Sequence, residues 1–457
     1  MRCSPNPIAS SLLALTLACV LSSGIWAVAA APAKPPKAPA ENPTKAEKPD
    51  MPPAARIDAS KYPNLQAAFD AVPESGGLVK LPPGDFKLTA PLVLSRGNTR
   101  VEGAGAATRL INCNEQGQPA LIVRPPDLDK NPRASLWRVQ LADFRIQGDP
   151  NAIDAKSTEP KSGDGLLAQR VNEIYLHGLS VDHNGGNGVT LDHCTEDPRV
   201  ADSIFTYNAQ TGLNVLGGHD IVVSANHFEE NCDALRCIDS YNLCMNGNNL
   251  DDHLGNGVVI ENTYGSVLSG NMIEECDGTA VVLDRDCYGI TISANVLADN
   301  FAKLPDSRAG GVDLRDAWGC TVSANTFTID VLQGLAVGPA SGRITVTGNN
   351  FSDSYVGETT RREGTPNLAT GILLQGTSDI VISGNLFSGL DRHAVKADAA
   401  CRRLSVTGNI VMEVHRGSDE KLPPIDLGGA PESVCEQNVV KEREIVKKKQ
   451  APKAKTP

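Results

Sequence analysis

A short pattern that ends in asparagine returns about every 23 residues through most of this chain. Clear copies are the segments 221–226, 266–271, 290–295, 320–325, 344–349, 380–385 and 404–409, and weaker copies place Gly178, Ser203 and Asn248 at the Asn position. Repetition at such a period is typical of solenoids, in which each repeat packs only on its neighbours. This repeat constrains the fold more than any other feature of the sequence.

Each repeat holds two short segments in which apolar residues alternate, as in 212–215 and 221–226. This alternation predicts half-buried strands. Two such strands cannot bury their apolar faces alone. Stacked coils can, because each strand then pairs in parallel with its copies above and below. We therefore predict an all-β fold, a single parallel β-helix over residues 57–440.

The repeated asparagine has a physical role in such a stack. We expect it to adopt a left-handed turn conformation and to bond through its amide to the Asn of the next coil. Aromatic residues are only 4% of the chain, so we expect Val, Ile, Leu, Ala and Cys to fill the interior.

A short helix is predicted over residues 64–72, before the first repeat. Leu65, Phe69 and Val72 share one face of this helix. It could cover the open end of the solenoid, because terminal coils need a cap.

The repeats and this opening segment resemble the pectate-lyase superfamily of right-handed parallel β-helices. The opening is most similar to the rhamnogalacturonase/epimerase-like pectate lyase domain. The resemblance implies a single-stranded right-handed parallel β-helix with a short N-terminal capping helix. The resemblance says little about the chemistry, because proteins with this fold include lyases, hydrolases, epimerases and binding proteins.

The two ends of the chain differ from its middle. Residues 1–29 are predicted to be a secretory signal peptide with an A-x-A cleavage site at 27–29, residues 30–56 a Pro/Ala/Lys-rich linker, and residues 441–457 a basic disordered tail. The protein is therefore expected to be exported, to the periplasm, the cell surface or the extracellular space. Export permits disulfides among the cysteines, but the sequence does not give their pairing.

The charge of the chain restricts its partners. The net charge is -12, and the repeat region is more acidic still because the ends are basic. This acidity argues against nucleic acid as a partner. After the N-terminus, no apolar run reaches the ~20 residues that a membrane span needs.

Acidic residues follow the Asn position in several consecutive repeats. They are Glu229, Glu230, Asp251, Asp252, Glu274, Glu275 and Asp299. Stacked carboxylates repel unless solvent or a cation lies between them. One interpretation is a Ca²⁺ site with Asp252 and Glu275 as ligands; the other is a solvated acidic edge.

Two repeats carry longer insertions, which bring basic residues toward this acidic edge. The insertion after Asn295 contains Arg308, and the one after Asn349 contains Arg361. Long loops on one face of a solenoid often bind ligands. We predict that both arginines bind substrate. The alternative is that the two insertions have no function.

Charged residues also fall at outward positions of the strand that follows the acidic edge. Alternation puts Leu235 and Cys237 inside and Arg236 outside, and the same logic exposes Asn214, Glu261, Asp313 and Arg315. Trp318 and Tyr288 lie in matching turns and could stack on sugar rings. We predict Glu261, Arg315 and Trp318 as substrate-binding residues; the alternative is a repeated turn with ion pairs between coils.

The polygalacturonase pattern fits this chain at Asp233 alone, and Asn256 stands where that family has histidine. A lyase needs only a base at C5 of a uronate and a neutralised carboxylate. We predict Arg236, Asp233 and His253 as the catalytic residues, with Arg236 first. The alternative for His253 is an inert surface residue.

The function predicted from these features is a secreted carbohydrate-active protein that acts on a polysaccharide. Lyase chemistry is favoured over hydrolysis, and a monomer is expected. The alternative is a non-catalytic glycan-binding or surface-adhesion protein.

Overall fold

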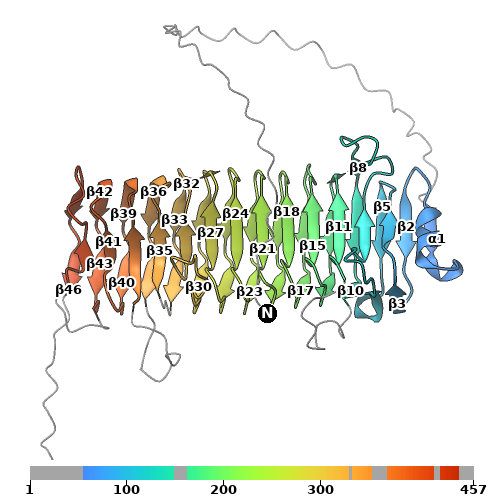
Figure 1. Ribbon diagram of the computed structural model, residues 1–457, viewed down its shortest axis with the longest axis horizontal. Coiled ribbons are helices and arrows are strands. Elements are labelled where there is room, and N and C mark those ends of the chain that lie inside the picture. Colours follow the sequence, from blue (N-terminus) through green and yellow to red (C-terminus); the bar gives the residue numbers. More distant parts are fainter. Residues whose placement is uncertain (1–54, 149–161, 329–331, 353–367, 416–421, 442–457) are drawn as a thin grey trace, which may run out of the picture. The chain divides into compact units, whose positions relative to one another are not determined.

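The computed structural model describes residues 55–148, 162–328, 332–352, 368–415 and 422–441. Short strands from successive coils stack side by side into three long parallel sheets (Figure 1). Paired residues lie one repeat apart in the sequence, such as Leu213 with Leu235 and Leu235 with Val258. The predicted all-β parallel β-helix is confirmed.

We name the three sheets A, B and C. Sheet A consists of β1 (Ala55–Asp58), β2 (Gly77–Lys80), β5 (Thr99–Glu102), β9 (Val139–Ala142), β13 (Tyr175–His177), β16 (Arg199–Ala201), β19 (Val222–Ser224), β22 (Cys244–Asn246), β25 (Val267–Ser269), β28 (Cys287–Tyr288), β29 (Thr291–Ser293), β32 (Ala317–Trp318), β33 (Thr321–Ser323), β36 (Gly342–Thr347), β39 (Ser378–Ser383), β42 (Arg402–Thr407) and β45 (Val434–Glu436).

Sheet B follows sheet A along each coil. It consists of β3 (Gly84–Leu88), β6 (Thr108–Asn112), β10 (Arg145–Gly148), β14 (Ser180–Asp182), β17 (Ile204–Thr206), β20 (His227–Glu229), β23 (Asn249–Asp251), β26 (Met272–Glu274), β30 (Val296–Ala298), β34 (Thr326–Thr328), β37 (Asn350–Ser352), β40 (Leu386–Ser388), β43 (Ile410–Met412) and β46 (Val439–Lys441).

Sheet C completes each coil. It consists of β4 (Leu92–Leu94), β7 (Leu121–Val123), β11 (Leu166–Gln169), β15 (Val189–Asp192), β18 (Leu213–Leu216), β21 (Leu235–Ile238), β24 (Val258–Glu261), β27 (Val281–Asp284), β31 (Val312–Leu314), β35 (Gln333–Val337), β38 (Thr370–Leu374), β41 (Val395–Ala397) and β44 (Ile425–Asp426). A separate pair is formed by β8 (Leu136–Trp137) and β12 (Val171–Asn172).

One α-helix, α1 (Leu65–Asp70), is present among the described residues. Asn64 caps its N-terminus, and Leu65, Ala68 and Phe69 are buried. Gln66 bonds to both backbone groups of Val93 in β4. Figure 1 shows α1 beside β2, at the N-terminal end of the row of coils. That it shields the open end of the solenoid stays a prediction.

The turn between sheets A and B contains the predicted asparagine ladder. The amide Nδ2 of each Asn donates to Oδ1 of the Asn in the next coil, at 3.0 Å from Asn226 to Asn248 and 2.9 Å from Asn271 to Asn295. The ladder continues without a break to Asn438. The expected left-handed conformation is one residue earlier, at Ala225 and its equivalents, because the Asn must turn inward to reach its neighbours.

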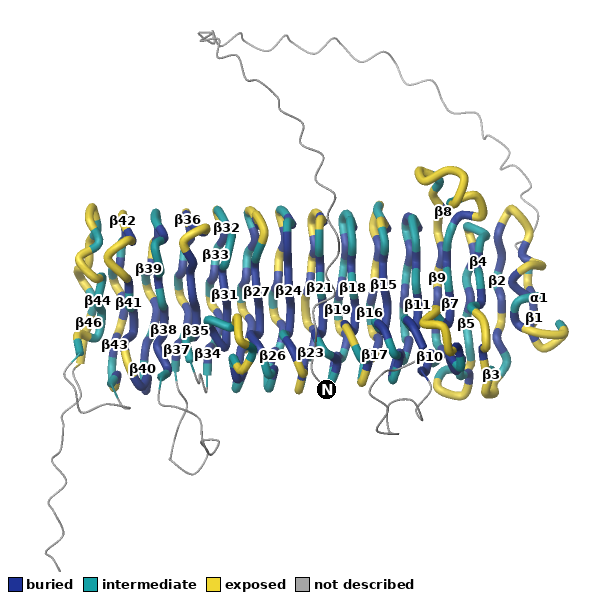
Figure 2. Tube along the Cα trace, in the orientation of Figure 1, coloured by how far each residue is buried: buried dark blue, intermediate teal, exposed yellow. Residues whose placement is uncertain are grey.

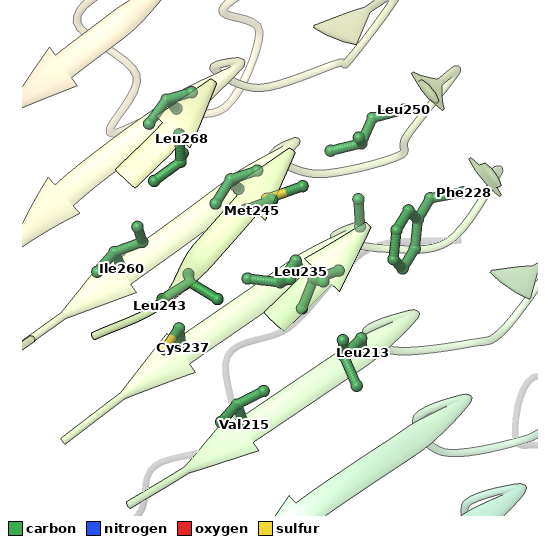
Figure 3. Packing of buried hydrophobic residues seen from close by; sticks show 14 of the residues in the cluster. Leu213, Val215, Phe228, Leu235, Cys237, Leu243, Met245, Leu250, Ile260 and Leu268 are labelled. Atoms are coloured by element: carbon green, nitrogen blue, oxygen red, sulfur yellow. The ribbon is translucent and has the colours of Figure 1, made fainter. Parts of the chain in front are cut away.

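The interior is filled by inward side chains from all three sheets, and each coil is buried on its inner side (Figures 2 and 3). Phenylalanine contributes more to this core than the sequence indicated. Six of the nine Phe residues are fully buried, and Phe327, Phe351 and Phe387 stack at 4.3 and 4.9 Å. Stacked copies of one position bring rings face to face, so a few aromatic residues form a continuous column.

Candidate functional site on the outer face of sheet C

Strand β21 places Arg236 on the outer face of sheet C. Leu235 and Cys237 are fully buried on either side of it, as alternation predicts. The Arg236 guanidinium contacts two carboxylates, Asp233 at 3.0 Å and Glu261 at 3.5 Å. Arg285 reaches the same Glu261 at 3.4 Å. These four side chains form one ion-pair cluster, which we call the Arg236 cluster.

The two carboxylates of this cluster are buried, although both were expected on the surface. Glu261 is 7% exposed because two guanidinium groups cover it, whereas the Arg285 side chain is 70% exposed. Asp233 also accepts a hydrogen bond from the Asn256 backbone N–H at 2.7 Å. The prediction that Glu261 is exposed is therefore wrong, and Arg285 is the solvent-facing cation of the cluster.

Asp233 belongs to a row of polar residues in the turn before each strand of sheet C. Asp164 accepts from the Asn187 backbone N–H at 2.8 Å and from the Thr190 hydroxyl at 2.6 Å. Asn256 in turn accepts from the Thr279 backbone N–H at 3.0 Å. Burial raises the pKa of Asp164. These bonds between coils hold the turn beside the Arg236 cluster in place.

The insertion after Asn295 is tied to sheet C by a buried aspartate. Arg308 and Arg315 both bond to Asp313, which is 0% exposed, and Arg315 also reaches Asp306 at 2.7 Å. The expectation that Asp313 is exposed is wrong, because the insertion folds back and covers it. Arg308 and Arg315 were predicted to bind substrate. In the structure both bond to Asp313 and hold this loop against sheet C.

His253 is inside the solenoid, so the expectation of a surface turn is wrong. It is 1% exposed and occupies a position that Asn fills in preceding coils, as at Asn208 and Asn231. Its Nδ1 lies 3.2 Å from the Asn231 backbone nitrogen and 3.4 Å from the Asn231 carbonyl oxygen. Burial lowers the pKa of His253 to about 3. A buried ring cannot take a proton from an external polysaccharide.

The acidic edge is formed as predicted, at the end of sheet B. Asp251 pairs in register with Glu229 and Glu274. Burial raises the pKa of Glu230, Asp251 and Glu274, and neighbouring carboxylates raise it further. The edge therefore contains carboxylates that repel one another.

Asp252 and Glu275 follow these strands in left-handed turn conformations. Among the residues that the structure describes, no group of three or more His, Cys, Asp or Glu side chains is arranged to hold a metal ion. The Ca²⁺ site with Asp252 and Glu275 as ligands stays a prediction, and we assign no step to the ion.

The repulsion predicts a pH-dependent stability. A carboxyl whose folded pKa is raised stabilises the fold below its unfolded pKa and loses that contribution as pH rises through the folded value. We therefore expect Asp251→Asn to raise the melting temperature at neutral pH and to flatten its decline between about pH 4 and pH 7. Thermal unfolding across this range measures the effect. The exposed Glu74→Gln is the control, and an equal change in both variants would contradict the prediction.

Trp318 is not one of the side chains of the Arg236 cluster. It belongs to β32 of sheet A, where it pairs with Tyr288 of β28. Arg361 lies outside the described residues. The structure thus brings Asp233, Arg236 and Glu261 together, as predicted, whereas His253 is buried inside the solenoid.

Tyr288 and Trp318, expected in matching turns, belong to a longer row of aromatic residues whose other members were missed. His219, Tyr241, Tyr264, Tyr288 and Trp318 each lie seven residues before the Asn of their repeat. They pair in parallel from coil to coil. Searching for other residue types at a constant distance from the Asn would have found this row.

Comparison with known proteins supports the fold. Residues 164–327 match the model of the right-handed beta helix region family. No curated protein matches the sequence significantly. No helix in the described part of the chain is long and apolar enough to cross a membrane.

Solved structures with the same architecture have low sequence identity to this chain. The A-module of the mannuronan C-5 epimerase AlgE6 from Azotobacter vinelandii is 16% identical, with a TM-score of 0.52 over 83% of this chain and 94% of its own. Pre-mature gene product 12 of bacteriophage phi29 is also 16% identical, with a TM-score of 0.66 over 81% of this chain and 53% of its own. DFA-IIIase from Arthrobacter chlorophenolicus is 14% identical, with a TM-score of 0.51 over 78% and 93%. The chain is therefore a right-handed parallel β-helix protein.

Proposed function

We propose that this chain is an exported, monomeric protein that acts on a polysaccharide at the outer face of sheet C, by lyase chemistry rather than hydrolysis. The observation that carries the proposal is Arg285, whose side chain is 70% exposed although it contacts buried Glu261 at 3.4 Å. A cation that faces solvent beside a shared carboxylate can exchange that partner for the carboxylate of a uronate. Two of the similar structures are a mannuronan C-5 epimerase and a DFA-IIIase, which supports a carbohydrate-active role.

β-Elimination needs a neutralised uronate carboxylate and a base at C5. In our proposal Arg285 and Arg236 bind the carboxylate, which makes the C5 hydrogen more acidic. When Arg236 turns from Asp233 to the substrate it uncovers this buried carboxylate, which then accepts that proton as the C4–O bond breaks and the C4–C5 double bond forms. The leaving oxygen takes a proton from water.

The roles of the candidate catalytic residues differ from the initial hypothesis. Arg236 acts as a charge partner and not as the base, because its guanidinium contacts the carboxylates of Asp233 and Glu261. His253 is excluded from contact with substrate by its burial. The proposed lyase mechanism therefore depends on Asp233 as the base and on Arg236 and Arg285 as partners of the substrate carboxylate.

Non-catalytic glycan binding is the second candidate, and one observation favours it. Asp233, Arg236 and Glu261 already satisfy one another, and Asp233 is further held by Asn256. A cluster whose charges are compensated can hydrogen-bond to sugar hydroxyls without any chemical step.

The two candidates are separated by measuring product formation on uronic-acid and neutral polysaccharides. We expect ultraviolet absorbance from an unsaturated uronate, and we expect Arg285→Ala to lower turnover at least about tenfold without changing the melting temperature. Arg199→Ala, an exposed arginine of sheet A, is the control. N-terminal sequencing of the secreted protein should find a mature start near Ala30.

Other outcomes would point elsewhere. Reducing ends without absorbance would indicate hydrolysis, and binding without turnover would favour the second candidate. Full turnover in Arg285→Ala would exclude this face. Arg236→Ala is a poorer test than the sequence suggested, because it leaves two buried carboxylates without their shared cation.

A further inference from the structure

A column of ring side chains runs along the turn between sheets C and A. We call His219, Tyr241, Tyr264, Tyr288 and Trp318 the aromatic strip. They occupy five consecutive coils and pair in parallel from each coil to the next, so neighbouring members are about 4.8 Å apart along the stack. The chain has only seven Tyr and three Trp residues, and four of these ten are in the strip.

Every member of the strip reaches the surface, although to different extents. Tyr241 is 50% exposed and Tyr288 is 49% exposed, whereas His219, Tyr264 and Trp318 are half-buried. The interior of these coils is filled by other residues, such as Leu243, Met245 and Leu268 (Figure 3). The rings are therefore not needed to fill the core, and contiguous exposed apolar surface of this kind marks an interaction site.

In the C-terminal half of the strip, the rings of Tyr288 and Trp318 each lie over a glycine of the next coil. The Tyr288 ring covers Gly319, where a Cβ atom would be 3.4 Å from it, and the Trp318 ring covers Gly342, where a Cβ atom would be 2.7 Å away. Gly319 has a positive φ that itself favours glycine, but Gly342 does not. Close approach of Trp318 and of the neighbouring backbone is thus what requires glycine at position 342. The Arg343 guanidinium carbon lies 5.8 Å from the centroid of the Trp318 ring. A ligand would stack on the ring surface that these contacts leave open.

The N-terminal half of the strip is arranged differently. Tyr241 and Tyr264 stack on each other at 5.5 Å with an interplanar angle of 19°, which hides the faces between them. The Tyr264 hydroxyl donates to Asp286 at 3.0 Å. This half offers ring edges and hydroxyl groups.

Hydrogen-bonding groups flank the strip on both sides. Asn242 donates to Asp220 at 2.8 Å, and Asn262 donates to Asp239 at 2.7 Å. Carboxylates and amides beside rings suit a ligand with apolar faces and hydroxyl edges, which is the chemistry of a pyranose sugar. The same carboxylates repel a polyanion.

We propose that the aromatic strip is a second glycan-binding site, which takes an uncharged pyranose polysaccharide laid along the stack of coils. It rests on the proposed function only in that both ligands are polysaccharides. The two sites are neighbours, because Asp286, which accepts from Tyr264, follows Arg285 directly in the chain, and they differ in the groups that they present. Sheet C presents Arg285 to a uronate, whereas the strip presents rings and carboxylates to neutral sugars.

Binding of soluble neutral polysaccharides, such as a β-glucan and a galactomannan, tests the proposal by affinity electrophoresis of the purified protein. Tyr288→Ala and Trp318→Ala should each weaken binding about tenfold. Gly342→Ala should also weaken binding, because its methyl group displaces the Trp318 ring without removing it. Trp137→Ala is the matched control, since Trp137 is 37% exposed in β8, outside the strip. Melting temperatures report whether each variant is folded.

Tryptophan fluorescence gives a second readout. In the mature protein, which begins near Ala30 and so lacks Trp26, a Trp137→Phe background lets the emission of Trp318 be followed. It should shift when the neutral polysaccharide is added, and polygalacturonate should not compete. Arg285→Ala should keep this shift even if it loses turnover, so the failure of one site is distinguishable from the failure of the other. The proposal is overturned if no neutral polysaccharide binds, if the strip variants bind as tightly as the parent, or if they lose self-association instead of glycan binding.

Discussion

Replacing Phe351 by alanine is expected to lower the free energy of unfolding by about 3–5 kcal/mol. Phe351 is fully buried in β37 and stacks on Phe327 at 4.3 Å and on Phe387 at 4.9 Å. Its removal leaves a cavity in the middle of a column. Both neighbours are held by their own coils, so the column cannot collapse to refill the space.

Equilibrium unfolding in urea, followed by circular dichroism, measures this loss. Ile410→Ala is the control, because Ile410 points outward from the same sheet and is 47% exposed. A loss in Phe351→Ala no larger than that in Ile410→Ala would show that the column does not stabilise the solenoid.

The second large effect is expected from Asn295→Asp, which changes one atom of the asparagine ladder. Asn295 is 1% exposed, and its Nδ2 donates to Asn325 Oδ1 at 3.0 Å and to the Leu268 carbonyl at 3.1 Å. An ionised aspartate has a carboxylate oxygen at this position. It faces the Asn325 Oδ1 and the Leu268 carbonyl oxygen and cannot donate a hydrogen bond to either. An ionised, unpaired carboxylate in this position should cost about 3–5 kcal/mol.

The pH dependence of this variant identifies the cause. Burial and the facing carbonyl groups raise the pKa of the new carboxyl in the folded state, so it binds its proton more tightly when folded. The deficit should be full at neutral pH and should shrink as pH falls through the raised pKa, where a protonated Asp can donate again. Asn246→Asp, at an exposed position of sheet A, should show neither effect. A deficit independent of pH would indicate a steric cause.

The compensated charges of the Arg236 cluster bear on both proposals. Its side chains contribute to holding successive coils together, and Arg285 is the most exposed of the four, at 70% against 31% for Arg236. Any substrate that enters must therefore compete with an internal ion pair. This competition gives Arg285→Ala a clearer functional readout than substitution of the buried members.

The period of the sequence determined the solenoid. The spacing of the asparagines, the alternation of apolar residues and the outward direction of Arg236 depend on the coil alone, and each can be derived from residues close in the chain. The contact between Asp233 and Arg236 follows from the same local logic, because the two residues are three positions apart in one coil.

Only the tertiary structure decided which charged residues are buried. Asp313 is covered because the path of the insertion brings Arg308 over it, and Glu261 is covered by arginines from the coils on either side. His253 was expected in a surface turn. A polar residue in a row such as Asn208, Asn231 and His253 is instead buried by its neighbours in adjacent coils. Burial of this kind depends on partners about 23 residues away and on the route of irregular turns, and neither is encoded in a local pattern.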